Sequence, residues 1–347
     1  MTNNRHNVVL FDNDPQEYRE YIAGIKHGSK MKWDAVRLKA NEPQTSKWKA
    51  VKRYIKYFIL PLHVYMDRHN YNIIVGWQSF YAINFAFYCR LFRAKKENKV
   101  VIQHCIYKPK NGITGKIYEQ YMRFALDNEY VDIIQTEAEG YAQILQDTFS
   151  IPKEKIKYVQ FGVNDFTKWD IPEKQNSDKD FVLCIGRSNR DWDYIIETLK
   201  HTDIPIVIIC DILDKSKEKE NIKILTDVDN EKSFYYFKNC RCTLTAVKDG
   251  DLSSGDTVFC QQLAFGKPAI IVKPCSLTNN YLIEGYNGVS VERNADELIR
   301  AIRLMYQDQK YYKELTDNCR KDFEEKYTLF RHGVKIGKLV KKYLVQE

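Results

Sequence analysis

The residues from Ser253 to Val272, SSGDTVFCQQLAFGKPAIIV, combine a small-residue turn, a helix start and a buried strand. The turn has little side chain to block a ligand, and a helix is expected from Asp256 to Phe265. Gly266 and Pro268 then end that helix. Its first backbone N–H groups would point back into the turn, which predicts a diphosphate site. The alternative is an ordinary strand, turn and helix without a ligand, because such turns are common in α/β proteins.

A second pattern lies in residues 47–60, KWKAVKRYIKYFIL. Apolar residues recur at helical spacing on one side, and cations crowd the other. Such a helix suits an anionic membrane surface. The alternative is an ordinary helix of the first domain, with its apolar side on the sheet and its lysines in water. The membrane or acceptor residues expected here are Trp48, Lys49, Lys52, Arg53 and Lys56.

A third pattern, VVLFDNDPQ, places Asp12 and Asp14 directly after an apolar strand. Two carboxylates so close together hold a divalent cation in some phosphatases and in glycosyltransferases of the GT-A type. Gln16 departs from the phosphatase pattern, and the pair lies too near the N-terminus for GT-A. Short Asp-rich turns after a first strand are also common, so this remains a rival interpretation.

The composition indicates a globular protein of two domains. A chain of 347 residues is longer than a single hydrophobic core usually supports, which favours two domains. The formal charge of +8 is modest for that length. The nine cysteines lack paired zinc-site spacing and resemble reduced core residues of a cytosolic protein. The longest apolar runs fall short of a membrane span, and no nucleic-acid recognition module is visible. We therefore expect a cytoplasmic protein, peripheral on the membrane face if residues 47–60 bind there.

Strands alternate with helices along the whole chain, which argues for an α/β fold with doubly wound parallel sheets. The first-half strands are expected at 8–11, 72–75, 100–104 and 131–136. A polar segment at 164–179 is the best linker, and a second alternation follows it. Asn294 and Glu297 form a capping box that starts a late helix. The expected domains are 1–165, 166–330 and a C-terminal helix, 331–347, which packs back toward the first domain.

Four segments in this order carry a family resemblance: KIYEQYMRFALDNEYVDIIQTEAEGYAQILQDTFSIPKEKIKYVQFGVN, IGRSNRDWDYIIETL, SSGDT with QQLAFGKPAII, and NYLIEGYNGVSVERNADELIRAI. Together they resemble the GT-B glycosyltransferases of the large retaining group called family 4, from about Asn72 onward. The resemblance implies two Rossmann-like domains facing a central cleft. It also implies transfer of a sugar from a UDP- or GDP-sugar to a glycan or lipid-linked acceptor, with retained configuration and no cofactor. The resemblance also implies a role in cell-surface polysaccharide synthesis, which is common in this family.

The resemblance also assigns site residues. Arg187 and Arg190 match the cations that bind the donor diphosphate, where they would stabilise charge on the leaving phosphate without a metal. His104, at the end of its strand, matches a histidine near the reacting sugar; a satisfied core histidine is equally open. The remaining donor-binding residues implied are Gly186, Thr226, Asp227, Val228, Ser254, Gly255, Asp256, Thr257 and Gln261.

One departure bears on activity. The family carries two glutamates with seven residues between them, and here these places are Ser253 and Gln261. The Gln261 amide can still donate and accept hydrogen bonds with ribose hydroxyls. The alternative to an enzyme is therefore a GT-B protein that binds nucleotide sugars without transferring them. The sugar, the base and the linkage depend on pocket shape.

Overall fold

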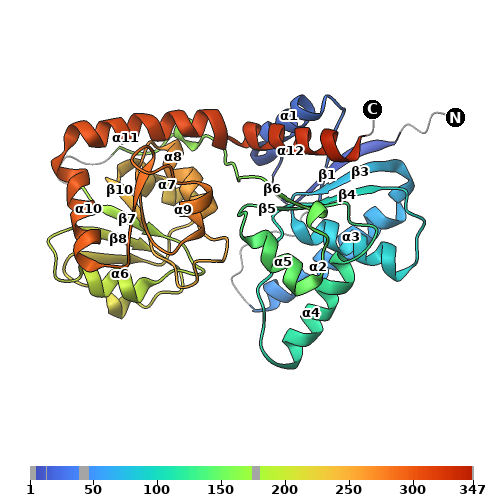
Figure 1. Ribbon diagram of the computed structural model, residues 1–347, viewed down its shortest axis with the longest axis horizontal. Coiled ribbons are helices and arrows are strands. Elements are labelled where there is room, and N and C mark those ends of the chain that lie inside the picture. The colour runs from blue at the N-terminus through green and yellow to red at the C-terminus, as the bar shows by residue number, and fades with distance from the viewer. Residues whose placement is uncertain (1–4, 13, 39–46, 174–179, 346–347) are drawn as a thin grey trace. The chain divides into compact units, whose positions relative to one another are not determined.

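The computed structural model describes residues 5–12, 14–38, 47–173 and 180–345, without the side chains of Lys47, Lys49 and Ala50. The chain divides into two compact units. Unit 1 comprises Met1–Val159 with Leu329–Glu347, and unit 2 comprises Gln160–Thr328. Each unit holds one six-stranded sheet in which every strand pair is parallel (Figure 1). The predicted fold class, α/β with two doubly wound parallel sheets, is confirmed.

The sheet of unit 1 has the strand order β2-β1-β3-β4-β5-β6. Its strands are β1 (His6–Phe11), β2 (Asp34–Arg37), β3 (Tyr71–Gly76), β4 (Lys99–Ile102), β5 (Ile133–Thr136) and β6 (Ile156–Tyr158). Central strands such as Val8–Phe11 and Val100–Ile102 are buried throughout. Parallel sheets are covered by helices on both faces, so their strands read as continuous apolar runs.

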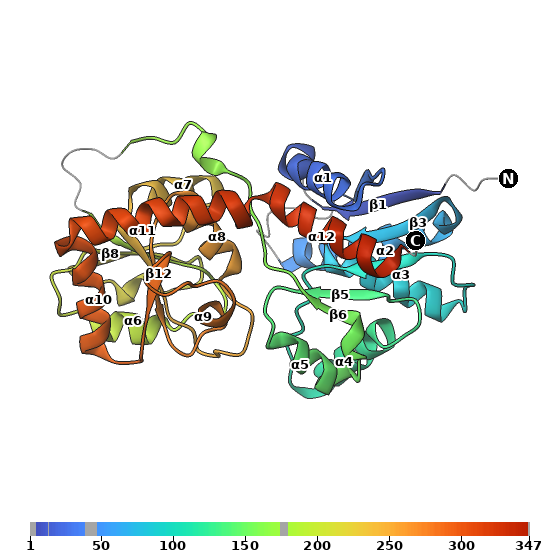
Figure 2. The ribbon, with the colours of Figure 1, turned by 45° about the horizontal axis from the view of Figure 1, so that its top comes forward.

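The helices of unit 1 are α1 (Pro15–Ser29), α2 (Lys47–Met66), α3 (Ser79–Leu91), α4 (Gly112–Leu126), α5 (Tyr141–Phe149) and α12 (Leu329–Leu344), with the short η1 (Arg68–Asn70) and η2 (Lys153–Lys155). The C-terminal α12 lies along α1 (Figure 2). A Cβ on Gly24 would lie 2.1 Å from the Phe330 oxygen, and one on Gly333 would lie 2.4 Å from the Tyr21 oxygen. Glycines on both helices therefore allow the two backbones to touch.

The sheet of unit 2 has the strand order β12-β11-β10-β7-β8-β9. Its strands are β7 (Val182–Ile185), β8 (Ile206–Ile209), β9 (Ile222–Leu225), β10 (Cys242–Thr245), β11 (Ala269–Val272) and β12 (Gly288–Val291). Its helices are η3 (Phe166–Lys168), α6 (Trp192–Leu199), η4 (Lys215–Lys217), α7 (Asn230–Asn239), α8 (Asp256–Ala264), α9 (Ser276–Asn280), α10 (Ala295–Gln307), α11 (Gln309–Asp322) and the π-helix η5 (Phe323–Tyr327). The Asn294 side chain caps α10 by accepting from the Glu297 backbone at 3.1 Å, as its sequence predicts.

Two predictions need correction. The strand expected at 100–104 ends at Ile102, because His104 has a left-handed backbone (φ 52°) that no strand continues. The first described residues of the expected linker pack on unit 2. Phe166 stacks on Phe234 with ring centroids 4.1 Å apart, and Asp165 pairs with Arg320 at 2.7 Å. Residues 174–179 of that segment lie outside the described chain.

Candidate functional site

The strand order of unit 2 contains a topological switch point between β7 and β10. From β7 the chain proceeds to β8 and β9 on one side, and from β10 it proceeds to β11 and β12 on the other. The loops after β7 and β10 therefore begin side by side and lead to opposite sides of the sheet, which leaves a crevice between them. Doubly wound folds bind ligands in such a crevice outside the strand ends. The two segments expected to bind the diphosphate are the loops after β7 and β10.

Arg190 joins the two loops. Its guanidinium is buried, at 6% exposure, and its Nη1 donates to the Ser254 Oγ at 3.0 Å. Its Nε donates to the Ile185 oxygen at 3.3 Å. Among the described residues, no carboxylate lies within ion-pair distance of Arg190. Burial lowers the pKa of Arg190, opposed by nearby Cys275 and Asp256, yet a guanidinium keeps its charge in proteins.

Two glycines make room for this cation. Gly186 has φ +142°, and a Cβ there would lie 2.8 Å from the Arg190 Nε. Gly255 has φ +98°, and a Cβ there would lie 3.1 Å from the Arg190 Nη2. Both positions therefore favour glycine through their backbone and through the guanidinium beside them. The predicted residues Gly186, Arg190, Ser254 and Gly255 are brought together by the fold.

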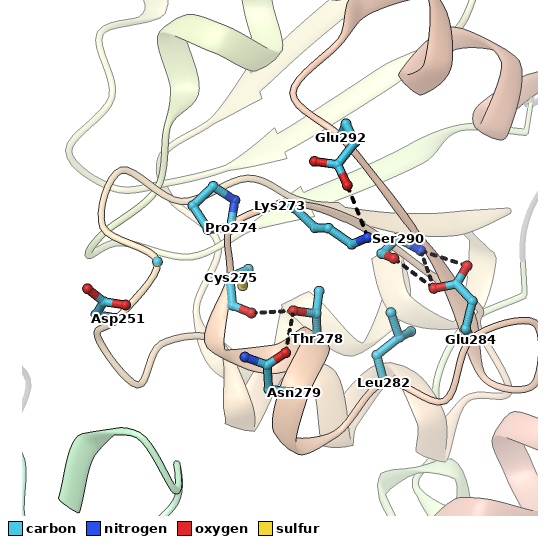
Figure 3. Close-up of a pocket in the computed structure, with 11 residues that line it drawn as sticks. Asp251, Lys273, Pro274, Cys275, Thr278, Asn279, Leu282, Glu284, Ser290 and Glu292 are labelled. Carbon is cyan, nitrogen blue, oxygen red and sulfur yellow. Dashed lines mark hydrogen bonds and ion pairs between the residues drawn. The ribbon is translucent and has the colours of Figure 1, made fainter. Parts of the chain in front are cut away.

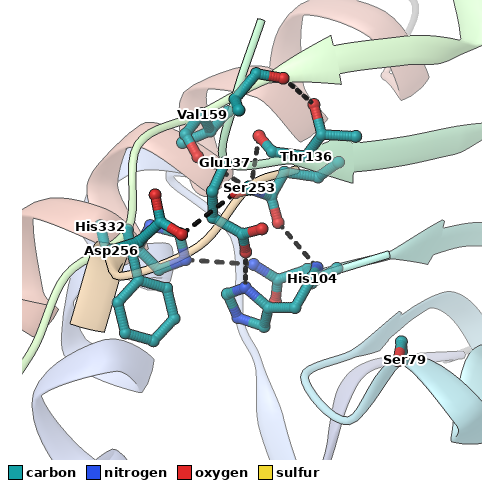
Figure 4. Close-up of polar contacts among 12 residues, drawn as sticks. Ser79, His104, Thr136, Glu137, Val159, Ser253, Asp256 and His332 are labelled. Atoms are coloured by element: carbon teal, nitrogen blue, oxygen red, sulfur yellow. Dashed lines mark hydrogen bonds and ion pairs between the residues drawn. The ribbon is translucent and has the colours of Figure 1, made fainter. Parts of the chain in front are cut away.

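Helix α8 starts at this cation and is buried from Phe259 to Ala264. At its first position, Asp256 accepts a hydrogen bond from the Ser253 Oγ at 3.0 Å (Figure 4). This carboxylate offsets part of the positive charge that Arg190 and the helix N-terminus supply. Thr257, the next predicted residue, is exposed. Val258 and Phe265 are half-buried, while Phe259 and Cys260 are buried.

Arg187 lies apart from the buried cluster. Its side chain is 63% exposed, and its Nε lies 3.3 Å from Asp211 Oδ1, in the loop after β8. An exposed pair of this kind is weak and exchanges readily for another anion. The two predicted arginines thus differ: one is held in place by the fold, and the other is available to solvent.

The residues expected to contact the base follow β9, the outermost strand on the β8 side of the unit 2 sheet. Thr226 and Val228 are half-buried and Asp227 is exposed. Gln261 of α8 is buried at 5% exposure, and its Nε2 lies 3.5 Å from the Asn230 Oδ1 at the start of α7. This contact links α8 to the segment that follows β9. Asn230 was missed at the sequence level, although it directly follows the expected base segment.

A polar cavity of about 670 Å³ lies beyond the switch point on the β11 and β12 side (Figure 3). Gly250 and Cys275 form part of its wall, and Lys273 pairs with Glu292 across it at 3.1 Å. Glu284 accepts hydrogen bonds from Ser290. Gly250 belongs to the same loop after β10 as Ser254, so one wall of this cavity comes from a loop of the arginine site.

In unit 1, His104 contacts a carboxylate that the sequence analysis did not name. Its Nδ1 pairs with the Glu137 Oε1, just after β5 (Figure 4). Glu137 is buried at 4% exposure, and Trp77 packs edge-on to the histidine ring with centroids 4.8 Å apart. A carboxylate on Nδ1 fixes the histidine tautomer. The sequence shows a polar residue after the strand at 133–136, but its contact with His104 follows from the pairing of β4 with β5 in the sheet.

Asp12 and Asp14 do not converge on one point. Asp12 is buried and accepts from the Gln78 Nε2 at 3.1 Å. Asp14 is exposed and pairs with Arg37. The described residues include no group of three His, Cys, Asp or Glu side chains with metal-binding geometry. The carboxylate pair of the rival interpretation is therefore split between two different environments.

Helix α2 exposes the apolar residues that an ordinary helix would bury. Trp48 is 82% exposed, and the exposed fraction of Val51, Ile55 and Ile59 is close to one half. Arg53 and Lys56 are half-buried and Lys52 is exposed. The apolar stripe at those positions therefore does not pack on the sheet. The predicted Lys49 side chain lies outside the described residues.

Within the described part of the chain, no helix is both long and apolar enough to cross a membrane. All nine cysteines are free thiols and buried, as the sequence pattern predicts.

No protein-family model and no curated protein matches this sequence. Solved structures do match it over nearly the full chain. A glycosyltransferase from Rickettsia africae ESF-5 is 14% identical with a TM-score of 0.61, covering 99% of this chain and 100% of that one. HepE from Anabaena, in complex with UDP-glucose, is 12% identical with a TM-score of 0.65, covering 97% and 100%. The chain has the GT-B fold.

A third GT-B structure is WaaG, a glycosyltransferase involved in lipopolysaccharide biosynthesis. It is 10% identical with a TM-score of 0.61, covering 96% of this chain and 99% of that one. Identities this low establish the GT-B fold, and the chemistry must be argued from this chain's own residues.

Proposed function

We propose that this GT-B protein is a retaining glycosyltransferase that uses a nucleoside diphosphate sugar. The observation that supports the proposal best is Arg190, a buried cation that forms no ion pair with any described residue. It lies at the start of α8 and at the switch point of its sheet. A diphosphate there would accept hydrogen bonds from the guanidinium and from the first α8 amides. Arg187 would leave Asp211 and add a second cation.

In the proposed reaction, the bond between the sugar C1 and the β-phosphate oxygen breaks. A bond from C1 to an acceptor hydroxyl oxygen forms on the same face, and the acceptor proton passes to the leaving phosphate. Negative charge grows on the diphosphate as the sugar leaves, so fixed cations stabilise the transition state more than the ground state. His104, oriented by Glu137, would hydrogen-bond the donor sugar or orient the acceptor.

The donor proposed is a UDP- or GDP-sugar. HepE, which shares the fold, has been solved with UDP-glucose. Gln261 and the segment from Thr226 to Val228 would contact the ribose and base, since they share the β9 end of the sheet edge. The proposed acceptor is a glycan or a lipid-linked sugar of cell-surface polysaccharide synthesis. WaaG, which shares the fold, is involved in lipopolysaccharide biosynthesis.

The second candidate is a nucleotide-sugar-binding protein without transfer activity. Ser253 and Gln261 stand where the resembling family has glutamates, and both are engaged within the protein, with Asp256 and Asn230 respectively. A thermal-shift panel of UDP, GDP, ADP, dTDP and CMP tests donor binding first. A ligand at a hundred times its Kd adds about 2.7 kcal/mol to the native state. No shift with any nucleotide contradicts both candidates; binding without sugar transfer or donor hydrolysis favours the second.

We further propose that α2 binds an anionic membrane surface, which places the protein on the cytoplasmic membrane face. The exposed stripe of Trp48, Val51, Ile55, Phe58 and Ile59 would enter the interface, and the cations beside it would meet lipid phosphates. On α4, Ile113 and Ile117 are also exposed, at 79% and 64%. Phe58 of α2 packs on Tyr121 of α4 with centroids 5.6 Å apart, so the two helices adjoin.

Liposome flotation tests the membrane proposal. Each cation near an anionic surface contributes about 1 kcal/mol, so removing three should weaken binding by about a hundredfold. The variant replaces Lys52, Arg53 and Lys56 by glutamine, and a matched control replaces the exposed Lys215, Lys310 and Lys321 of unit 2. Binding to anionic vesicles that survives the α2 changes, or that falls equally in the control, contradicts the proposal.

A further inference from the structure

The sheet of unit 1 has its own topological switch point, between β1 and β3. From β1 the chain proceeds outward to β2, and from β3 it proceeds to β4, β5 and β6 on the other side. The loop after β1 carries Asp12, and the loop after β3 carries Trp77 and Gln78. The backbone amide of Trp77 donates to the Leu10 oxygen at 3.1 Å, so the start of one loop is tied to the other strand. Ligands of doubly wound folds bind outside such strand ends.

Asp12 is a buried carboxylate with few partners. It is 7% exposed, and its Oδ2 accepts one hydrogen bond, from the Gln78 Nε2 at 3.1 Å. No cation of the described residues lies within ion-pair distance. The neighbouring cations are engaged elsewhere: Arg37 pairs with Asp14, and Arg53 lies 5.7 Å from the Tyr57 ring centre. A buried carboxylate of this kind is costly unless further donors reach it.

Gln78 fixes the polarity of the groups around Asp12. Its Oε1 accepts from the Phe80 amide at 3.4 Å and so caps α3. Its Nε2 therefore points toward Asp12 and also donates to the Tyr57 hydroxyl at 3.2 Å. The Tyr57 oxygen is thus an acceptor for Gln78, and its own proton remains for another partner. Burial raises the pKa of Tyr57, against the effect of Arg53 and together with that of Asp12, so the hydroxyl stays protonated.

Two groups therefore flank the Gln78 amide: the Asp12 carboxylate, which accepts hydrogen bonds, and the Tyr57 hydroxyl, which has a proton to donate. A sugar hydroxyl both donates and accepts, so it matches this pair. A phosphate or carboxylate matches poorly, because it brings a second negative charge to a buried carboxylate. The geometry of this switch point therefore selects for a neutral ligand group.

We propose that Asp12 and Tyr57 bind a hydroxyl group of a neutral saccharide, which is the acceptor of the proposed transfer, and that Asp12 excludes phosphorylated sugars from this position. The assignment of this saccharide as acceptor rests on the proposed function. The binding itself does not.

The test is saturation-transfer NMR on the whole protein with methyl α-glycosides of glucose, galactose, mannose, N-acetylglucosamine and rhamnose, and with glucose 6-phosphate. At least one neutral glycoside should bind the natural protein. Asp12→Asn and Tyr57→Phe should each weaken that binding by about tenfold or more. Asp14→Asn is the matched control, because Asp14 is exposed and engaged by Arg37, and it should bind normally. Glucose 6-phosphate should bind only after Asp12 is neutralised.

Hydrogen exchange on the natural protein gives a measurement that needs no variant: a bound glycoside should protect the backbone amides of residues 77–81. The proposal is overturned if no neutral glycoside binds, or if Asp12→Asn and Tyr57→Phe both bind as the natural protein does. UDP and GDP binding is measured in the same samples. Saccharide binding that depends on Asp12, without any nucleotide binding, removes the proposed function but leaves this site standing. Nucleotide binding without saccharide binding that depends on Asp12 overturns this site and leaves the proposed function in place.

Discussion

Replacing Arg190 by methionine separates a ligand-binding cation from a structural one. In the ligand-free protein, the change removes two hydrogen bonds that the charged guanidinium donates, to Ser254 and to the Ile185 oxygen, each of which stabilises by about 1.5–3 kcal/mol. It also removes a buried charge that has no ion pair among the described residues, and apolar replacements of buried charges are often neutral or stabilising. The two effects oppose each other. We therefore expect the free energy of unfolding to change by no more than about 1–2 kcal/mol.

Donor binding should respond far more strongly. Hydrogen bonds between charged groups stabilise by about 1.5–3 kcal/mol each, and a guanidinium on a diphosphate makes two. The expected loss is about 3 kcal/mol or more, which is over a hundredfold in Kd. Isothermal titration with the nucleotide that gives the largest thermal shift measures the loss, and urea unfolding without ligand measures stability.

Arg187→Met is the matched control. Arg187 is 63% exposed and its pair with Asp211 is of the weak surface kind, so stability should change by less than about 0.5 kcal/mol. Its donor affinity should fall by only about tenfold, because an exposed cation is screened by water and salt. The reasoning is refuted if Arg190→Met binds the nucleotide as tightly as the natural protein. A loss of several kcal/mol in stability with unchanged affinity would show that Arg190 is structural.

Three further predictions follow from the same contacts. Gly186→Ala should destabilise the protein by about 1–2 kcal/mol and weaken nucleotide binding, because its Cβ would meet Arg190 and its backbone has φ +142°. Gly140→Ala is the control, because nothing lies within 4 Å of a Cβ placed there. Equal effects of the two changes on urea unfolding and on nucleotide titration would contradict the argument. Glu137→Gln should lower the rate of sugar transfer by about tenfold through His104 while leaving the nucleotide Kd unchanged; a parallel fall in affinity would show a wider disturbance. Burial raises the pKa of the Cys275 thiol to about 11, so at pH 8 only about one such thiol in a thousand is ionised. Ellman's reagent should therefore label the native protein slowly. Rapid labelling before unfolding would contradict the buried positions of all nine cysteines.

The elements of the fold follow closely from local sequence where apolar runs are continuous. Val8–Phe11, Val182–Ile185 and Ala269–Val272 are apolar runs of four residues, which are short for a helix and suit strands of a sheet that is covered on both faces. Strand β2, which the sequence analysis did not predict, has no such run. β2 reads DAVR and lies at the edge of its sheet, half-buried or exposed, so its pairing with β1 and not its own composition makes it a strand.

For the site, the small-residue turn before a helix was visible in the sequence, and the family resemblance supplied Gly186, Arg190, Ser254 and Gly255, which the fold brings together. The sequence could not rank the two arginines. Only two residues lie between Arg187 and Arg190, yet Arg187 is exposed and Arg190 is held between two glycines. Glu137 and Asn230 were likewise found only when neighbouring strands brought their loops beside His104 and Gln261.

The sequence by itself determined the two-sheet α/β architecture, the reduced cysteines and the segments that carry the site, since these depend on patterns within some twenty residues. Tertiary structure alone decided which groups meet. Strand order placed the loops after β7 and β10 together, although about sixty residues separate Arg190 from Ser254. It also turned the apolar stripe of α2 outward and isolated Asp12 from every described cation. Contacts between distant segments depend on the order in which strands pair, and no local pattern encodes that order.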